Sequence, residues 1–155
     1  MEQLNLPFYQ FTTRNAKGKE EIFDVIRRKF VALTPEEWVR QHFIHYLNTE
    51  KNVPLWMIAV EKTLIYNRMN KRADILVYSG NGKPLLMAEC KAASVPINQR
   101  VFDQVARYNL TMRVPFLVVT NGLVQICCKI NLDEASYEFL DDIPDYETLV
   151  RSENL

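Results

Sequence analysis

Cysteine is scarce in this chain, and the signals that direct a protein into or across a membrane are missing. The three cysteines, Cys90, Cys127 and Cys128, are too few and too poorly spaced for a disulfide framework or a zinc site. Apolar runs such as "PLWMIAV" are only long enough for strands, and "MEQLNLPFYQ" lacks the pattern of a signal peptide. We therefore expect reduced core cysteines, no membrane segment and a cytoplasmic location.

The chain also lacks net charge, with 19 basic and 19 acidic residues. The charges are unevenly distributed, however, because eight acids and one base follow from Asp133 onward. Basic residues gather earlier, in "RRK" (27–29), in "RMNKR" (68–72) and at Arg100, Arg107 and Arg113. A basic body with an acidic tail is compatible with a polyanion such as DNA, although charge runs alone more often form solvated faces.

A length of 155 residues suits one domain with its own core. "FYQFTT" (8–13), "EIFDVI" (21–26) and "KFVAL" (29–33) predict a β-rich N-terminal extension over residues 1–33. Thr34 and Glu37 frame a helix start with Pro35 at its first position, which predicts a helix over 34–50. A second helix is predicted over 97–112, and the tail from Asp133 shows no clear period.

Strands are predicted over 54–66, 73–79, 85–92, 115–120 and 123–130, with turns at 67–72 and 80–84. The order helix, three strands, helix, strand indicates an α/β or α+β sheet with a helix on each face. We place the core at 34–130 and the acidic tail at 131–155.

The dipeptide Asn81-Gly82 is typical of a two-residue hairpin turn and sets a register. Gly80 then faces Lys83, and paired positions sum to 163. In that register Asp74 lies opposite Glu89 and Arg72 opposite Lys91. The other face pairs Ala73 with Cys90, Ile75 with Ala88 and Val77 with Leu86, so it is apolar and belongs to the core.

Two carboxylates directly opposite each other destabilise a sheet, so the pair Asp74 and Glu89 requires a reason. A divalent cation is one, because Mg²⁺ is commonly bound by one or two protein carboxylates and waters. The alternative is a mixed-charge patch in which Arg72 and Lys91 neutralise the two acids.

These residues resemble the core of PD-(D/E)xK nucleases, in the order "RAD" (72–74), strand, tight turn, strand and "ECK" (89–91). Ala73 stands where the superfamily motif has proline. From about Thr34 to Ile130 the chain is similar to the N-terminal nuclease-like domain of type I restriction enzyme R subunits, on "TPEEWVRQHFIHYL", "VEKTLIYNRMNKRADILVY", "GKPLLMAECKA", "FDQVARYN" and "VPFLVVTNG". More narrowly, it resembles the small stand-alone bacterial members. The resemblance implies a restriction-endonuclease-like mixed sheet with an α-β-β-β-α-β core.

The resemblance also implies roles for individual residues. Asp74, Glu89 and the Cys90 carbonyl would bind Mg²⁺ or Mn²⁺, and Lys91 would position or activate the attacking water. Gln104 and Tyr108 match the QxxxY element of related nucleases and would support Lys91 or contact the DNA backbone. Without the hairpin they would be an ordinary surface glutamine and a half-buried tyrosine.

Other polar residues have a structural and a functional interpretation. Glu61, an acid within an apolar strand, is either a further metal carboxylate or the partner of a basic residue. Glu37 fits a capping box, and we interpret His42 and His45 as structural. The arginines expected to contact DNA phosphates are Arg72, Arg100 and Arg107, with Arg27 and Arg28 as further candidates.

The main functional hypothesis is therefore a Mg²⁺-dependent DNA endonuclease related to restriction–modification systems. The chain has no G-x-x-x-x-G-K-[ST] loop, so it would act alone, as a homodimer, or with a separate motor or specificity protein. The alternative is a catalytically weak or inert module that binds nucleic acid or assists assembly. A purely structural domain is a third possibility.

Overall fold

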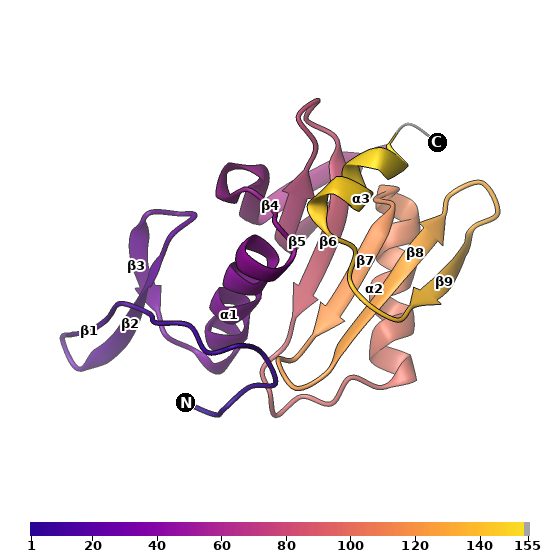
Figure 1. The fold of residues 1–155 in the computed structure, drawn as a ribbon. Coiled ribbons are helices and arrows are strands. Elements are labelled where there is room, and N and C mark those ends of the chain that lie inside the picture. Colours follow the sequence, from indigo (N-terminus) through magenta and orange to yellow (C-terminus); the bar gives the residue numbers. More distant parts are fainter. Residues whose placement is uncertain (154–155) are drawn as a thin grey trace.

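The computed structural model describes residues 1–153, which form a six-stranded mixed sheet, a separate three-stranded sheet and three α-helices. The large sheet has the order β4-β5-β6-β7-β8-β9, and β6 and β7 are its parallel pair (Figure 1). Its strands are β4 (Ile58–Tyr66), β5 (Met69–Tyr78), β6 (Pro84–Cys90), β7 (Phe116–Thr120), β8 (Gln125–Asn131) and β9 (Ser136–Leu140). The predicted mixed α/β class and its α-β-β-β-α-β core are confirmed.

Helices cover both faces of this sheet. Helix α1 (Pro35–Glu50) and the short α3 (Tyr146–Ser152) pack on one face, and α2 (Gln99–Met112) packs on the other (Figure 1). Phe43 and Leu47 of α1 join the core of the first face, whereas Phe102 and Val105 of α2 join that of the second. The strands between them are buried on both sides, which explains their almost continuous apolar sequences.

The N-terminal extension forms a three-stranded antiparallel sheet of β1 (Thr13–Ala16), β2 (Lys19–Asp24) and β3 (Lys29–Ala32). Its first strand begins at Thr13, so the strand predicted over 8–13 is wrong. Lys17 and Gly18 both have positive φ and close the tight turn that follows. The preceding residues instead pack on α1, where Phe11 contacts Trp38 and His42.

The β5–β6 hairpin has the predicted central register, although its turn differs. The loop spans residues 80–82, with Gly82 at φ 77°, and the Ser79 N–H donates to the Lys83 carbonyl. This turn shifts the pairing by one residue, and a β-bulge restores it, so that Ile75 pairs with Ala88 and Val77 with Leu86. The predicted pairing of Gly80 with Lys83 is therefore wrong, and the predicted register is confirmed from Val77–Leu86 to Ile75–Ala88. The pairing ends there, so the predicted ladder pairs of residues 72–74 with residues 89–91 do not form.

Two other segments differ from the sequence prediction. Strand β5 begins at Met69, because Asn67 and Arg68 both adopt positive φ and form a turn that is shorter than expected. Residues 54–57 include a 3₁₀ turn, Leu55–Met57, before β4 begins. The acidic tail contributes β9 and α3, and the Tyr146 hydroxyl of α3 donates to the Tyr78 carbonyl near the hairpin turn.

The crossover through α2 brings the carboxyl ends of β6 and β7 to the same edge of the sheet. The Lys91 N–H extends this pairing by donating to the Thr120 carbonyl at 2.8 Å. The first turn of α1 lies near this edge, since Arg40 of α1 makes an ion pair with Asp74 of β5. Residues from α1, β4, β5 and β6 therefore meet there.

Gly122 provides a test of how the N-terminal segment is anchored. It has φ 82°, and a Cβ atom there would lie 2.8 Å from Leu4 Cδ2. We predict that Gly122→Ala lowers the free energy of unfolding by about 1–2 kcal/mol, measured by chemical denaturation, because backbone strain adds to this clash. Gly80→Ala is the control, since a Cβ atom there would meet nothing within 4 Å and its φ is not positive, and it should change stability by less than about 0.5 kcal/mol. Equal effects of the two substitutions would contradict the anchoring role.

Candidate active site

Asp74 and Glu89 lie next to each other at the end of the β5–β6 pairing. The last paired residues are Ile75 and Ala88, and beyond them Asp74 Oδ2 accepts the Cys90 N–H at 2.7 Å. A carboxylate thus takes the place of a backbone carbonyl in the sheet. Burial raises the pKa of Glu89 to about 7, and the negative charge of Asp74 adds to this effect. The predicted carboxylate pair is brought together.

Local irregularity in two strands directs Asp74 and Glu61 toward α1. Ile75 and Val60 pack on the α1 face, whereas Ala73 and Leu64 pack on the α2 face. The strict alternation of a strand is therefore broken at Asp74 in β5 and at Glu61 in β4, and Glu61 has φ 52°. The prediction that Ala73 and Cys90 share a face is wrong for this reason. A non-glycine residue in this conformation within a strand indicates a constraint imposed by its surroundings.

Glu61 pairs with arginines from three elements, as one of its two interpretations from the sequence expected. Its carboxylate lies 2.7 Å from Arg72, 3.2 Å from Arg27 and 3.2 Å from Arg40. Partial burial disfavours the ionised form of Glu61, but the positive charges of Arg40 and Arg72 together outweigh burial and lower its pKa. The structure therefore places Glu61 in an ion-pair network, and its expected role as a metal ligand stays a prediction.

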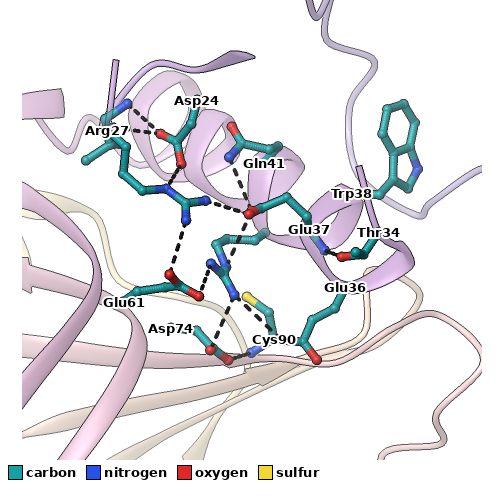
Figure 2. Close-up of polar contacts among 12 residues, drawn as sticks. Asp24, Arg27, Thr34, Glu36, Glu37, Trp38, Gln41, Glu61, Asp74 and Cys90 are labelled. Atoms are coloured by element: carbon teal, nitrogen blue, oxygen red, sulfur yellow. Dashed lines mark hydrogen bonds and ion pairs between the residues drawn. The ribbon is translucent and has the colours of Figure 1, made fainter. Parts of the chain in front are cut away.

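Arg27 ties the N-terminal sheet to this network (Figure 2). From the β2–β3 turn its guanidinium reaches Asp24 and Glu37 at 2.5 Å each. Thr34 caps α1 by accepting the Glu37 N–H, as predicted, but the Glu37 carboxylate binds Arg27 instead of returning to the cap. The N-terminal extension thus supplies a cation beside the carboxylates, a contribution that the sequence analysis gave only as a candidate phosphate contact.

Arg40 is a buried cation that the sequence analysis missed. Its side chain is 6% exposed and lies 3.6 Å from both Asp74 and Glu37. Its Nε and Nη1 atoms make no hydrogen bond with any described residue. Arg40 therefore neutralises the acids mainly by charge, and the helical spacing of Glu36, Glu37 and Arg40 was the signal for it.

The cation that pairs with Glu89 is Lys71, a residue that the sequence analysis assigned to a turn. Lys71 Nζ lies 3.4 Å from Glu89 Oε1 and 5.1 Å from the centre of the Tyr108 ring. Lys71 thus lies between Glu89 and the Tyr108 ring. The expected support of Lys91 by Gln104 and Tyr108 has no contact among the described residues.

Lys91 is half-buried and acts on Glu36 in the first turn of α1. Burial and the negative charge of Asp74 raise the pKa of Glu36, and the positive charges of Arg40 and Lys91 oppose that shift. Glu36 was not among the predicted site residues. It places a further exposed acid beside Asp74 and Lys91.

The remaining predicted residues occupy the surrounding surface. Arg100 and Arg107 are exposed on α2, and Gln104 and Tyr108 share a side of that helix. His42 and His45 pack among Tyr9, Phe11 and Trp38, which agrees with a structural role. The three cysteines are buried and unbonded to each other, as expected. Among residues 1–153 no helix is long and apolar enough to cross a membrane.

The carboxylate pair fits a divalent cation of the Mg²⁺ type. Glu89 Oε1 is buried and has no hydrogen-bond partner among the described residues, and the Cys90 backbone is adjacent. Within residues 1–153 no three His, Cys, Asp or Glu side chains gather in a way that would enclose a metal ion. Mg²⁺ commonly uses one or two protein carboxylates and completes its coordination with water and substrate phosphates, so two acids suffice.

Comparisons with known proteins identify the family and the fold. Residues 35–144 match the family described as type I restriction enzyme R protein N terminus. A solved structure, the fragment of a putative HsdR subunit of a type I restriction enzyme from Vibrio vulnificus YJ016, superposes with a TM-score of 0.55 at 19% identity. The similarity covers 77% of this chain and 25% of that one, so this chain spans about a quarter of its length. No curated protein matches.

The raised pKa of Glu89 predicts how stability depends on pH. Folding raises that pKa from 4.5 to about 7, so between these values the folded protein keeps a proton that the unfolded chain has released. The free energy of unfolding should therefore fall as pH rises through this window, by about 3 kcal/mol at most. Glu89→Gln should remove that part of the dependence, measured by chemical denaturation in the absence of metal.

Glu20→Gln is the matched control, because Glu20 is exposed on β2. It should leave the pH dependence unchanged. A wild-type protein and a Glu89→Gln variant with the same slope between pH 5 and pH 7 would contradict the assignment.

Proposed function

This chain belongs to the type I restriction enzyme R protein N-terminal family, and we propose that it is a divalent-metal-dependent endonuclease that hydrolyses phosphodiester bonds of DNA. The observation that carries the proposal is the pair Asp74 and Glu89, held together in spite of their like charge. Repulsion between two adjacent carboxylates destabilises a sheet that has only a structural role. A cation bound by both acids removes that repulsion.

In this proposal Asp74, Glu89 and the Cys90 carbonyl hold Mg²⁺ or Mn²⁺. The metal supplies a water of lowered pKa and a Lewis acid for the phosphate oxygens. Lys91, at the open end of β6, stabilises the negative charge that develops on the phosphate during attack. We assign the acceptance of a proton from water to Glu36, because Arg40 lies 3.6 Å from both Glu36 and Asp74 and the pKa of Glu36 is raised.

Lys71 and Arg40 neutralise the carboxylates before any metal is bound. Each lies within 4 Å of one member of the carboxylate pair. Lys71 is 3.4 Å from Glu89, and Arg40 is 3.6 Å from Asp74. Both cations would compete with a metal ion for the two acids. DNA phosphates would favour the ion, because they would add oxygen ligands and negative charge.

A second candidate function follows from the same two cations. If Lys71 and Arg40 satisfy the carboxylates permanently, the chain is an inert module that binds nucleic acid or assists assembly. In either case we propose DNA as the substrate or partner, with the exposed Arg72, Arg100 and Arg107 as the contacts to its phosphates. We propose a motor or specificity protein, or a second copy of this chain, as a further partner.

Lys91→Ala tests the catalytic mechanism. We predict that the purified protein nicks or degrades DNA with Mg²⁺ or Mn²⁺, and that Lys91→Ala reduces the rate at least about 100-fold, as expected for loss of a charge-stabilising group. Metal affinity and thermal stability should persist, because Lys91 touches neither Asp74 nor Glu89 in an ion pair among the described residues. Cleavage of a labelled single-stranded oligonucleotide and of supercoiled plasmid, measured side by side, gives the rates.

Lys83→Ala is the control, since Lys83 is exposed at the opposite end of β6. It should cleave like the unmodified protein. Undiminished cleavage by Lys91→Ala would overturn the mechanism, and metal binding without cleavage by any form of the protein would favour the inert module.

A further inference from the structure

A small hollow separates the β4–β5 hairpin from helix α2. Its volume is about 330 Å³, and it is lined by Met69, Gln104, Arg107, Tyr108 and Thr111. The four helical residues have spacings of three and four, so they form one stripe of α2 that faces Met69. The hollow is thus formed by a helix and a strand, and not by loops.

The walls of this hollow combine an apolar, an aromatic and an amide side chain. Met69 is 47% exposed and Tyr108 is 45% exposed, so a thioether and an aromatic ring are both left open to solvent. Gln104 adds an amide, which both donates and accepts hydrogen bonds. A planar aromatic group with polar edges complements this combination, since it packs against the ring and the thioether and bonds to the amide.

The surroundings of the hollow carry positive charge. Arg107 lines it, Lys71 lies 5.1 Å from the Tyr108 ring centre, and exposed Arg68 belongs to the same hairpin. This charge complements the phosphates on either side of a nucleobase. A neutral aromatic side chain of a partner protein has no need of it.

Lys71 also fixes the distance between the hollow and the carboxylate pair. The same ammonium group lies beside Tyr108 and 3.4 Å from Glu89 Oε1. A nucleotide with its base against Tyr108 therefore has its phosphate beside Lys71, next to Asp74 and Glu89. The two sites are neighbours along one strand of nucleic acid.

We propose that this hollow is a nucleobase subsite that holds an unpaired base of the DNA strand whose phosphate lies at the Asp74–Glu89 pair. The inference rests on the proposed function and specifies its substrate as single-stranded DNA or an unpaired end. A base inside a continuous duplex is stacked on both faces and cannot offer one to Tyr108.

Binding in EDTA tests the subsite apart from cleavage. A labelled oligothymidine, alone or paired with its complement, is titrated with protein and followed by fluorescence anisotropy. We expect tighter binding of the single strand, a loss of about tenfold in Tyr108→Ala, and retention within about twofold in Tyr108→Phe, which keeps the ring and loses the hydroxyl. Phe139→Ala is the matched control, because Phe139 is an exposed aromatic residue on β9, and it should bind like the unmodified protein.

Three results would each overturn the subsite: tighter binding of the duplex, unchanged affinity in Tyr108→Ala, or an equal loss in Tyr108→Phe, which would assign the hydroxyl in place of the ring. These results are distinguishable from failure of the nuclease proposal. If the protein shows the expected affinities but cleaves no DNA, the subsite proposal stands and the nuclease proposal fails. If the protein cleaves DNA and Tyr108→Ala binds it as tightly as the unmodified protein, the nuclease proposal stands and the subsite proposal fails.

Discussion

The hydrogen bond from the Cys90 N–H to Asp74 Oδ2 is the constraint on which the site depends. It ends the β5–β6 pairing with a side chain in the place of a carbonyl group, and so fixes the Asp74 carboxylate within the plane of the sheet. Glu89 precedes Cys90 and is buried beside this charge, and burial together with the charge raises its pKa to about 7. An ordinary strand end would let the two acids separate into solvent.

The neighbouring structure compensates for this concentration of charge. Arg40 from α1, Lys71 from β5 and Arg27 from the N-terminal sheet each lie against one or more acids. The compensation is incomplete, because two donor atoms of Arg40 and one oxygen of Glu89 have no hydrogen-bond partner among the described residues. Glu61 holds a left-handed backbone conformation in the same place. Strain, unpaired polar atoms and like charges that coincide at one edge are typical of a site kept for function at some expense of stability.

Local patterns in the sequence predicted much of this arrangement. The cap at Thr34, the strand-sized apolar runs and the Asn81-Gly82 signal led to α1, α2, the strands β4 to β8 and the central register. The predicted register is correct although the predicted turn is not. A three-residue loop and a bulge each shift the pairing by one position, and the two shifts cancel. Pattern alone cannot detect two such shifts that cancel.

The contacts that the sequence did not predict come from tertiary structure. The break in alternation at Asp74 and Glu61 depends on arginines contributed by α1 and by the β2–β3 turn, which are remote in sequence. Lys71 was assigned to a turn because Asn67 and Arg68 were not recognised as a complete two-residue turn. The sequences of β9 and α3 are too short to show a clear hydrophobic periodicity. Both elements are stabilised by their packing on the rest of the large sheet.

The most direct test of the proposed metal site is a calorimetric titration of the metal-free protein with Mn²⁺ near pH 7, carried out in buffers of different ionisation enthalpy. The carboxylate pair should bind one ion per chain and release a fraction of a proton, because Glu89 is partly protonated there and must ionise to bind. Asp74→Asn should lose both the binding and the proton release. Failure to bind the ion, or binding that is unaffected by Asp74→Asn, would contradict the claim that this carboxylate pair is a metal site.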